Sequence, residues 1–391
     1  MRHGLVIGKF YPPHVGHHHL IDVAARQVDR LTVLVMASRA ESLTLDERVR
    51  WLAEVHRDAP VDVIGAPCDV PMDLESDVVW TAHVAIMRGA VHAHTSAPID
   101  VVFSSESYGP ELAYRLGAEH VSVDPARVER PVSGTAVRHD LAGCWDHLHP
   151  VVRGGLATRV VVLGAESTGT TTGSSALADA YRARGGVWAR TGWVPEYGRE
   201  HTVLKQEQAC EDADRRGLVR PPMEELVWDA KDFAQVAERQ SRLEEQAARD
   251  GSPSLVCDTD ALATRVWERR YVGRDSHAAA GAVPTLSARR IYLLTDHVGV
   301  PFVQDGWRDG EHIRADMTEW FVEELTAAGV SWALLSGSLE ERIDLARRVI
   351  NEALLDAVQF DEPLGTGLAG RAPLTAWSPA DALAGCGAGC I

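Results

Sequence analysis

A chain of 391 residues that is 45% hydrophobic is long enough to build two or three domains with buried cores. Its formal net charge of −17 opposes nonspecific binding to nucleic acid, and no apolar stretch is long enough to cross a bilayer as a helix. The six cysteines form no Cys-x-x-Cys pair, which argues against both a zinc site and a disulfide framework. Because the N-terminus lacks a signal-peptide pattern, we expect a soluble cytoplasmic protein without nucleic-acid or membrane partners.

The first 150 residues alternate short apolar runs, which predict strands, with amphipathic stretches, which predict helices. We expect strands at residues 5–7, 31–37, 61–64, 99–103 and 120–123, and helices at 20–25, 45–55, 78–92 and 111–116. This alternation predicts an α/β domain, a doubly wound parallel sheet covered on both faces. In such a sheet, ligands bind at the carboxyl ends of the strands.

The string Gly-Lys-Phe-Tyr-Pro-Pro-His-Val-Gly-His occupies residues 8–17, between the first predicted strand and the following helix. Backbone N–H groups and the helix dipole favour bound phosphate at such a junction. The imidazoles of His14 and His17 can donate hydrogen bonds to a phosphoryl group that gains negative charge, and Gly16 lets a ligand approach closely. The weaker alternative is that the consecutive histidines 17–19 are a solvated helix start or a chance metal-binding tract.

A second string, Ser-Gly-Thr-Ala-Val-Arg at residues 133–138, predicts another helix start. Ser133 is a suitable N-cap, and Thr135 falls in the first turn. Arg138 lies further along that helix and can reach a phosphate with its forked guanidinium. Alone, this pattern is typical of an ordinary capped helix; downstream of the first string it favours phosphate binding.

The second half of the chain repeats the α/β pattern after a break at residues 150–155. Strands are expected at 159–163, 254–258, 290–295 and 331–336, and helices at 174–184, 222–248, 261–271, 313–328 and 339–355. We therefore predict two doubly wound parallel-sheet domains, at residues 1–150 and 158–358. The remaining segment, 361–391, is rich in Gly, Ala and Pro and is expected to be poorly ordered.

The string Gly-Ala-Glu-Ser-Thr-Gly-Thr-Thr at residues 164–171 follows a predicted strand and precedes a helix, as a phosphate-binding P-loop does. It departs from that pattern because Thr170 stands where the lysine is expected, while Thr171 still supplies the hydroxyl for Mg²⁺. Backbone N–H groups of the loop can cradle phosphate without the lysine. The alternative is a Gly/Thr-rich turn that binds nothing. Arginines available in the sequence to replace the missing charge are Arg153, Arg159, Arg308 and Arg314.

The strings at 8–17 and 133–138 resemble the His-x-Gly-His and Ser-x-Thr-x-x-Arg motifs of the nucleotidylyltransferase superfamily. Lys9, directly after Gly8, is most similar to the NadR-type branch, which joins a nicotinamide-mononucleotide adenylyltransferase to a ribosylnicotinamide kinase. The resemblance implies a Rossmann-like domain that uses ATP and Mg²⁺ to convert nicotinamide mononucleotide into NAD. It implies catalytic roles for Lys9, His14, His17 and Arg138, and ATP binding by Gly8, Phe10, Ser133, Thr135 and Arg138.

The acceptor site is expected on two further segments of the first domain. The Ser-Ser-Glu sequence at 104–106 follows a predicted strand and resembles the NadR-type segment that closes over the nucleotide, which implies that Ser105 and Glu106 bind the mononucleotide. Trp80 lies on a predicted helix and is a candidate to stack on the nicotinamide ring. A tryptophan on an amphipathic helix is more often a core residue.

Three segments of the second domain also resemble the NadR-type kinase: residues 193–200, 257–260 and 305–310. The first implies a site for nicotinamide riboside at Glu196, Tyr197 and Arg199, to which Asp260 is added. Asp258 ends a strand, where a catalytic base or Mg²⁺ ligand is expected. The implied ATP-binding residues are Gly164, Ser167, Gly169, Thr170, Thr171, Arg308 and Arg314, with Thr171 and Asp258 as the Mg²⁺ ligands.

Two other interpretations stay open. The second domain is a degenerate kinase that senses nucleotide, for which Thr170 is the reason, or the first domain uses another acceptor, such as a flavin or pantetheine phosphate. The expected small-molecule partners are otherwise ATP, nicotinamide mononucleotide, nicotinamide riboside and NAD. Self-association is suggested by the resemblance alone.

Overall fold

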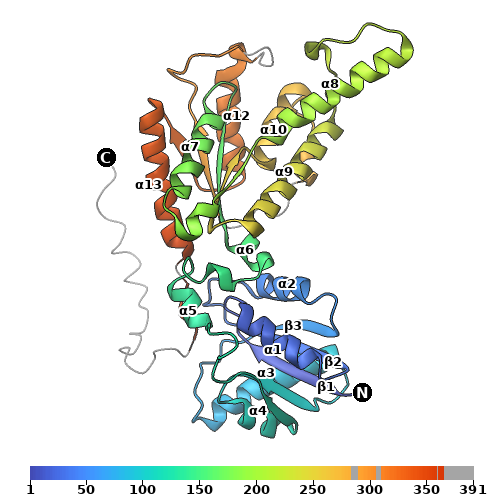
Figure 1. Ribbon diagram of the computed structural model, residues 1–391, viewed down its shortest axis with the longest axis vertical. Helices are drawn as coiled ribbons and strands as arrows, with labels where there is room; N and C mark the ends of the chain where they lie inside the picture. Colours follow the sequence, from blue (N-terminus) through green and yellow to red (C-terminus); the bar gives the residue numbers. More distant parts are fainter. Residues whose placement is uncertain (283–288, 305–309, 359, 365–391) are drawn as a thin grey trace, which may run out of the picture.

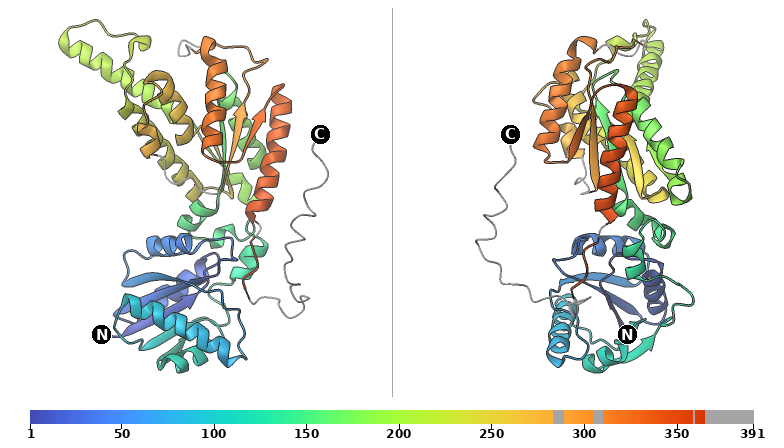
Figure 2. Two further views of the ribbon diagram at one scale, coloured as in Figure 1. Left: turned by 180° about the vertical axis from the view of Figure 1, so that it is seen from behind. Right: turned by 90° about the vertical axis from the view of Figure 1, so that its left-hand side faces the viewer.

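Two five-stranded parallel sheets organise the part of the chain that the computed structural model describes, residues 1–282, 289–304, 310–358 and 360–364 (Figure 1). Helices cover both faces of each sheet, and the two sheets lie at opposite ends of the elongated molecule (Figures 1 and 2). The predicted fold class, two doubly wound α/β domains, is confirmed. Arg308 and most of the segment predicted to be poorly ordered, residues 365–391, lie outside the described residues.

The first sheet has the strand order β3-β2-β1-β4-β5. Alternate residues of its central strand face two separate cores: Leu5 packs with residues of α3 and α4, and Val6 packs with residues of α1 and α2. The strands are β1 (His3–Gly8), β2 (Arg30–Ala37), β3 (Val61–Pro67), β4 (Val101–Ser104) and β5 (Glu119–Ser122), and the helices are α1 (Val15–Ala25), α2 (Leu45–Val55), α3 (Asp77–His94), α4 (Gly109–Leu116) and α5 (Gly134–His139).

The second sheet has the order β10-β9-β6-β8-β7. Its strands are β6 (Thr158–Gly164), β7 (Gly192–Val194), β8 (Ser254–Asp258), β9 (Arg290–Thr295) and β10 (Trp332–Leu335). Its helices are α7 (Thr170–Arg182), α8 (Tyr197–Arg216), α9 (Ala230–Asp250), α10 (Ala261–Tyr271), α11 (Ala278–Ala282), α12 (Arg314–Ala327) and α13 (Leu339–Val358). Single 3₁₀ turns are η1 (Trp145–His147), η2 (Gly186–Arg190), η3 (Met223–Glu225) and η4 (Glu311–Ile313).

Each domain begins with the central strand of its sheet, and the chain then builds first on one side of that strand and later on the other. In open α/β sheets, ligands bind at the carboxyl end of the strands where this reversal occurs. The loop after β1 carries the two histidines, and the loop after β6 carries the P-loop-like string. Both candidate phosphate sites therefore lie at the position that the topology favours.

Several predicted elements differ from the structure. The helix predicted at 222–248 begins only at Ala230, because the Asp229 carboxylate caps it by accepting hydrogen bonds from the backbone N–H groups of Lys231 and Asp232. A short helix, α6 (Pro150–Leu156), occupies the predicted break. Helix α8 was not predicted because it has almost no apolar face. Ala213 is its one buried residue, and the helix projects from the body of the molecule (Figure 1).

The two domains share a hydrophobic core across their junction. Trp145 is fully buried there, and its indole N–H donates to the carbonyl of Gly251 at 2.8 Å. Trp51 packs so closely on Gly155 that a Cβ added to this glycine would lie 2.3 Å from the indole ring. An ion pair between Glu54 and Arg249, at 2.7 Å, also crosses the junction. Helices long and apolar enough to traverse a membrane do not occur in the described residues.

Candidate active sites

The first candidate site is built around two stacked histidines at the N-terminus of α1. His14 is the N-cap of the helix, and the His17 ring lies 3.7 Å from the His14 ring, centroid to centroid, with 28° between the ring planes. The His14 Nδ1 accepts a hydrogen bond from the backbone N–H of Gly16 at 3.1 Å, and the His17 Nδ1 accepts one from the N–H of His14 at 3.3 Å. The capping box thus fixes the orientation of both imidazoles.

Burial sets the protonation of the two histidines, and the capping hydrogen bonds set their tautomer. Burial lowers the pKa of His14 to about 3, helped by the positive charge of Arg127, and burial lowers the pKa of His17 as well. Both imidazoles are therefore neutral near pH 7. Since each Nδ1 accepts a hydrogen bond, the proton of each neutral ring lies on Nε2. The site thus presents two oriented N–H donors beside a helix N-terminus, which is the environment that stabilises a phosphoryl oxygen.

The three consecutive histidines do not share one site. His17 bonds to His14, the His18 Nδ1 lies 3.0 Å from the His56 Nε2, and His19 lies 3.3 Å from the carboxylate of Glu129. Among the described residues there is also no group of three or more His, Cys, Asp or Glu side chains arranged to hold a metal. The interpretation of residues 17–19 as a metal-binding tract is therefore not supported.

Two residues of the string at 8–17, Gly8 and Phe10, support the His17 ring. Phe10 is buried with a positive φ of 48°, and its ring contacts the His17 ring edge-on at 5.0 Å. A Cβ added to Gly8 would lie 3.2 Å from the Phe10 ring, so this glycine makes room for that ring. Both residues thus hold the His17 ring in place, and their role in ATP binding stays a prediction.

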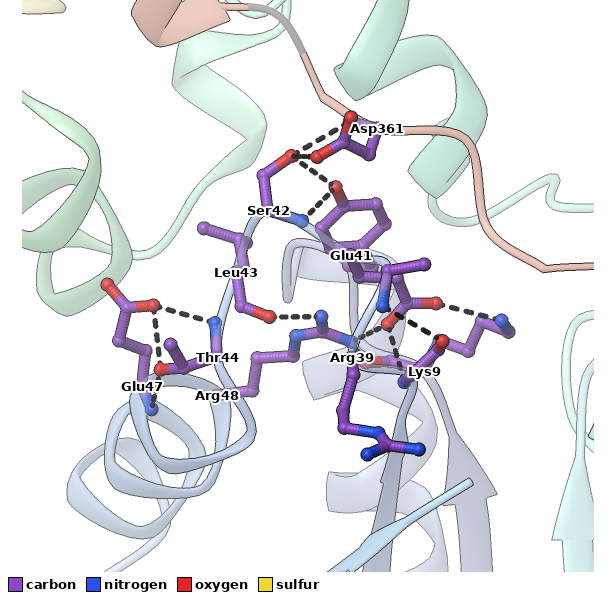
Figure 3. Close-up of polar contacts among 12 residues, drawn as sticks. Lys9, Arg39, Glu41, Ser42, Leu43, Thr44, Glu47, Arg48 and Asp361 are labelled. Carbon is purple, nitrogen blue, oxygen red and sulfur yellow. Dashed lines mark hydrogen bonds and ion pairs between the residues drawn. The ribbon is translucent and has the colours of Figure 1, made fainter. Parts of the chain in front are cut away.

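Lys9 belongs to a buried charge cluster that the sequence analysis missed (Figure 3). Its ammonium pairs with the Glu41 carboxylate at 2.8 Å, and the fully buried Arg48 pairs with the same carboxylate at 2.6 Å. Arg48 also donates to the carbonyls of Lys9 and Leu43. It therefore stabilises the loop between β1 and α1, residues 9–14, which we call the motif loop. One signal was available: Arg48 occupies the helical position that forms one buried face with Trp51 and Leu52.

Arg138 joins the second string to the first. Its Nη1 donates to the carbonyl of Tyr11 at 2.9 Å, and its Nη2 donates to the Thr135 hydroxyl at 3.2 Å. The Ser133 hydroxyl caps α5 by accepting from the N–H of Ala136. The hydroxyls of Ser133 and Thr135 are thus engaged within α5, whereas Arg138 contacts the motif loop between β1 and α1.

The end of the described chain returns to this first site. The Phe360 ring packs edge-on against the Tyr11 ring at 5.5 Å, and the Asp361 carboxylate accepts a hydrogen bond from the Ser42 hydroxyl at 3.0 Å (Figure 3). The Tyr11 hydroxyl lies 2.9 Å from that of Ser42. The segment after α13 of the second domain therefore contacts the motif loop of the first.

The residues predicted to bind the mononucleotide make contacts within the protein. Trp80 is 8% exposed, belongs to the core between α3 and the first sheet, and donates its indole N–H to the carbonyl of Leu74. This position matches the alternative of a core residue, and the stacking role stays a prediction. The Ser105 hydroxyl donates to the carbonyl of Val123, and Glu106 forms an ion pair with Arg127 at 2.8 Å.

The second candidate site is a cavity of 1010 Å³ at the carboxyl ends of β6 and β8. The loop after β6 forms one side of it. Gly164 must lack a side chain, because a Cβ there would lie 2.2 Å from the Thr295 hydroxyl. Ser167 and Gly169 have positive φ angles of 60° and 87°, and α7 begins at Thr170. The loop thus has the strand-to-helix turn of a phosphate cradle, without the lysine.

Asp258 lies on the strand next to this loop and is almost fully buried. Burial raises the pKa of Asp258 above its usual value, against hydrogen bonds from the hydroxyls of Thr171 and Thr170 that lower it. A carboxylate and a threonine hydroxyl at the N-terminus of the helix form an oxygen donor set that suits Mg²⁺, which takes few protein ligands and shares phosphate oxygens.

Helix α8 brings two further predicted residues to the cavity. Glu196 is its N-cap residue, and Arg199 in its first turn pairs with the Glu196 carboxylate at 3.2 Å. Burial, together with the negative charge of Asp258, raises the pKa of Glu196 to about 7. Tyr197 does not line the cavity; its backbone N–H donates to the side chain of Gln240.

Asp260 does not have the predicted position. It caps α10 by accepting from the N–H groups of Leu262 and Ala263, and it also accepts hydrogen bonds from Arg290 and the Tyr292 hydroxyl. Only 1% of its surface is exposed, and it does not line the cavity. Its carboxylate is thus engaged inside the domain and away from the cavity, which does not support the predicted riboside contact.

An aromatic wall completes the cavity, and the sequence analysis missed it. Its members come from the segment before α9, from α9 itself and from α10: Trp228, Phe233, Trp267 and Tyr271. The Trp228 ring lies 5.7 Å from the Tyr271 ring, and Trp267 and Tyr271 are stacked at 6.5 Å. The spacing of Trp267 and Tyr271 on α10 was visible in the sequence, but nothing in the sequence indicated that α9 and α10 face the same cavity.

Comparison with known proteins assigns each half of the chain to a family. Residues 5–139 match the cytidylyltransferase-like family, and residues 159–342 match an AAA domain family. The trifunctional NAD biosynthesis/regulator protein NadR of Escherichia coli (strain K12) is 24% identical over 321 residues, which span 78% of this chain and 71% of that protein. A nicotinamide-nucleotide adenylyltransferase of Methanoculleus marisnigri is 30% identical over 158 residues, 38% of this chain and 86% of that protein.

The fold similarity extends over both domains. A crystal structure of a NadR protein in complex with NR aligns with a TM-score of 0.58 at 21% identity, covering 90% of this chain and 95% of that one. The order of the domains, the strand-end positions of both loops and the relatives of each half agree. The chain is therefore NadR-like, with a cytidylyltransferase-like domain followed by an AAA/P-loop kinase-like domain.

Proposed function

We propose that the first domain transfers AMP from ATP to nicotinamide mononucleotide, giving NAD and pyrophosphate. A 5′-phosphate oxygen of the mononucleotide attacks the α-phosphorus of ATP, the bond to the α,β-bridging oxygen breaks, and pyrophosphate leaves with that electron pair. No covalent enzyme intermediate and no catalytic base are required. Catalysis then consists of positioning the two nucleotides and stabilising charge on the phosphoryl oxygens.

The observation that carries this proposal is the pair of Nε2–H donors on His14 and His17 at the N-terminus of α1. His17 would donate to the α-phosphoryl group and His14 to a neighbouring phosphate. Arg138, from α5, would contact the β- and γ-phosphates. The charge of Lys9 is shared with Glu41, so Lys9 would act on phosphate as part of a cluster that carries a net positive charge with Arg48.

Acceptor identity is the part of this proposal that needs its own experiment. The full chain is incubated with ATP, Mg²⁺ and one acceptor: nicotinamide mononucleotide, flavin mononucleotide or phosphopantetheine. Pyrophosphate release with nicotinamide mononucleotide at least about tenfold faster than with the other two supports the proposal. Faster release with flavin mononucleotide or phosphopantetheine would replace nicotinamide mononucleotide as the acceptor.

The second domain is proposed to phosphorylate nicotinamide riboside, which supplies the first domain with its substrate. The riboside 5′-hydroxyl oxygen attacks the γ-phosphorus of ATP, the bond to the β,γ-bridging oxygen breaks, and ADP leaves. The hydroxyl proton passes to the Glu196 carboxylate, whose pKa of about 7 suits a general base at neutral pH. Mg²⁺ held by Thr171, Asp258 and the phosphates would neutralise phosphate charge.

The composition of the cavity supports this substrate class. Nicotinamide riboside carries a positive charge on its pyridinium ring, and aromatic faces attract such cations. Trp228, Trp267 and Tyr271 line the cavity; Lys205 lies over one face of Trp228, and Arg270 lies over one face of each of the other two rings, so a pyridinium would meet a remaining face. The carboxylates of Glu196 and Glu200 line the same cavity. The backbone of the loop at residues 164–171, including Gly164, Ser167 and Gly169, would hold the ATP phosphates.

A nucleotide-sensing second domain is the competing function, and Thr170 is the observation that favours it. The assay that separates the two supplies ATP and Mg²⁺ with nicotinamide riboside in one reaction and nicotinamide mononucleotide in the other. Mononucleotide formed from riboside supports the kinase. NAD formed from the mononucleotide, with nothing formed from the riboside, would support a sensor.

A further inference from the structure

The loop after β6 lacks the cation that a P-loop normally supplies. Its backbone can hold phosphate, but Thr170 brings no charge to the γ-phosphoryl group. The carboxylates of Glu166, Glu196, Glu200 and Asp258 line the same cavity. An ATP γ-phosphate entering this acidic surrounding needs a positive side chain in addition to Mg²⁺, because unscreened like charges repel strongly in a partly buried site.

Most arginines near the loop are already committed to other groups. Arg314 uses both terminal nitrogens, on the carbonyls of Val300 and Ser167. Arg342 donates to the carbonyls of Gly337 and Thr168, and its buried Nη2 has no hydrogen-bond partner among the described residues. It lines a second cavity, of 310 Å³, and does not line the large one. These two guanidiniums hold the loop from behind and stabilise its shape.

The other candidates are equally occupied. Arg270 pairs with Glu166 at 3.1 Å. Arg153 donates to the carbonyl of Trp145, and Arg159 donates to Gly154 and pairs with Glu245, so both belong to the domain junction. The sequence offered Arg153, Arg159, Arg308 and Arg314 as replacements for the lysine. Arg153 and Arg159 are engaged at the domain junction, Arg314 is engaged on the two carbonyls given above, and Arg308 lies outside the described residues.

Arg199 differs from these arginines in its position in the large cavity, in its terminal nitrogens, which the described residues leave free, and in its exposure. Among the described residues it is the one arginine or lysine that lines the large cavity. Only its Nε is engaged, with the Glu196 carboxylate, and its two terminal nitrogens make no hydrogen bond within the described part of the chain. The side chain is 53% exposed, so the fork formed by Nη1 and Nη2 is accessible to a ligand.

The positive charge of Arg199 acts on two carboxylates, Asp258 and Glu196, in the part of the cavity where phosphoryl transfer would occur. It lowers the pKa of Asp258 and that of Glu196, against the burial that raises both. Asp258 lies at the end of the strand beside the loop and lines the same cavity as Thr170, which stands at the lysine position. The guanidinium on α8 thus lies electrostatically close to the site that lost its own cation.

We propose that Arg199 replaces the missing P-loop lysine and binds the γ-phosphoryl group of ATP in the second site. The inference rests on the proposed kinase function. Its ligand is the triphosphate end of ATP and not the riboside, which is the role that the sequence resemblance implies for this arginine. With Nε on Glu196 and the terminal nitrogens on phosphate, one side chain would align the base with the group that is transferred.

The test uses the full chain with Arg199→Ala, Thr170→Lys and the double variant. Arg199→Ala should lower the turnover of nicotinamide riboside phosphorylation about 100-fold, a typical loss for one preorganised charge-stabilising group. Thr170→Lys in the Arg199→Ala background should recover at least about tenfold, because the lysine restores charge from the loop side. Arg215→Ala, an exposed arginine on the same helix, is the matched control and should leave turnover unchanged. Adenylyl transfer by the first domain reports that each variant is folded.

Other outcomes overturn the proposal. Turnover of Arg199→Ala within about threefold of the wild type would exclude a phosphate role, and a loss that Thr170→Lys cannot restore would assign Arg199 to positioning Glu196 or the riboside. If the wild type phosphorylates no riboside, the kinase function fails, and ATP binding then decides the role of Arg199. Comparing the wild type with Arg199→Ala cancels binding at the first site: weaker ATP binding with unchanged AMP binding supports the proposal, and equal changes for both contradict it.

Discussion

The two phosphate sites of this chain begin in the same way and are completed differently. Each follows the central strand of a parallel sheet and ends in a helix N-terminus. In the first site, the loop itself carries the donors, because His14 and His17 are oriented by the capping of α1. In the second, the loop offers mainly backbone and Glu166, and the other charged and aromatic groups come from the end of β8, from the start of α8, from α9 with the segment before it, and from α10.

This difference decides how much a motif can say about each site. A short string holds nearly all of the first site's chemistry, so its histidines predict the site well. The second site is assembled from segments far apart in the sequence, so the change at Thr170 does not by itself decide whether the domain is active. The missing charge has to be sought on another element that lines the cavity.

The largest expected effect separates the two sites through His17. His17→Ala removes an oriented N–H donor and should lower adenylyl transfer about 10²- to 10³-fold. Riboside phosphorylation should stay unchanged, because the described residues that line the second cavity all belong to the second domain. Pyrophosphate release and mononucleotide formation are measured on the same protein. A variant that retains full pyrophosphate release contradicts the role of His17.

The reciprocal test removes charge from the second site. Asp258→Asn keeps the size of the side chain but loses the carboxylate beside Thr171, and we expect about a 100-fold loss of riboside phosphorylation. Adenylyl transfer serves as the control and should be unaffected. Equal losses in both reactions would mean that the substitution disturbs the fold and that the sites are not independent.

A smaller effect concerns pH. Burial and Asp258 raise the pKa of Glu196 to about 7, and the group acts as a base only when it is ionised. The kcat/KM for riboside phosphorylation should therefore rise between pH 6 and pH 8 and level off above. Glu196→Gln should abolish this rise in the residual activity while leaving the pH profile of adenylyl transfer unchanged. A profile that is flat or falls over this range argues against Glu196 as the base.

The smallest predicted effect tests how tightly the two domains pack at their junction. Gly155→Ala places a methyl group against the Trp51 ring at the shared core, and overpacking of this kind costs about 1–3 kcal/mol of unfolding free energy. We expect a lower melting temperature in a calorimetric scan, with both activities retained at low temperature. Gly281→Ala, where an added Cβ meets nothing within 4 Å, is the matched control. An unchanged melting temperature would contradict the tight junction.

The sequence predicted the elements whose apolar residues have clear periodicity. Nine of the ten described strands and most helices were expected close to their positions, because buried parallel strands appear as continuous apolar runs. The exception among the strands is the short edge strand β7, which was not predicted. Helix α8 was missed because its residues are polar on all sides, and α9 was placed too early because the cap at Asp229 was not recognised. Local signals of this kind depend on capping and exposure more than on periodicity.

The candidate sites show the same division. The positions of His14, His17, Thr171 and Asp258 at strand ends follow from motif and topology. Three other features depend on which distant segments meet in the fold, and a single sequence contains no direct signal for that. They are the buried Glu41–Arg48 ion pair, the aromatic wall and the hydrogen bonds that Asp260 accepts within the domain. Arg199 belongs to this second group, since its distinction is that its terminal nitrogens have no partner among the described residues.

The central claim is that one chain carries two linked reactions, and a time course with nicotinamide riboside, ATP and Mg²⁺ tests it most directly. We predict that nicotinamide mononucleotide appears first and NAD follows, and that His17→Ala stops the sequence at the mononucleotide. A protein that makes NAD from added mononucleotide but forms no product from the riboside would contradict the claim and leave the second domain as a nucleotide-binding module.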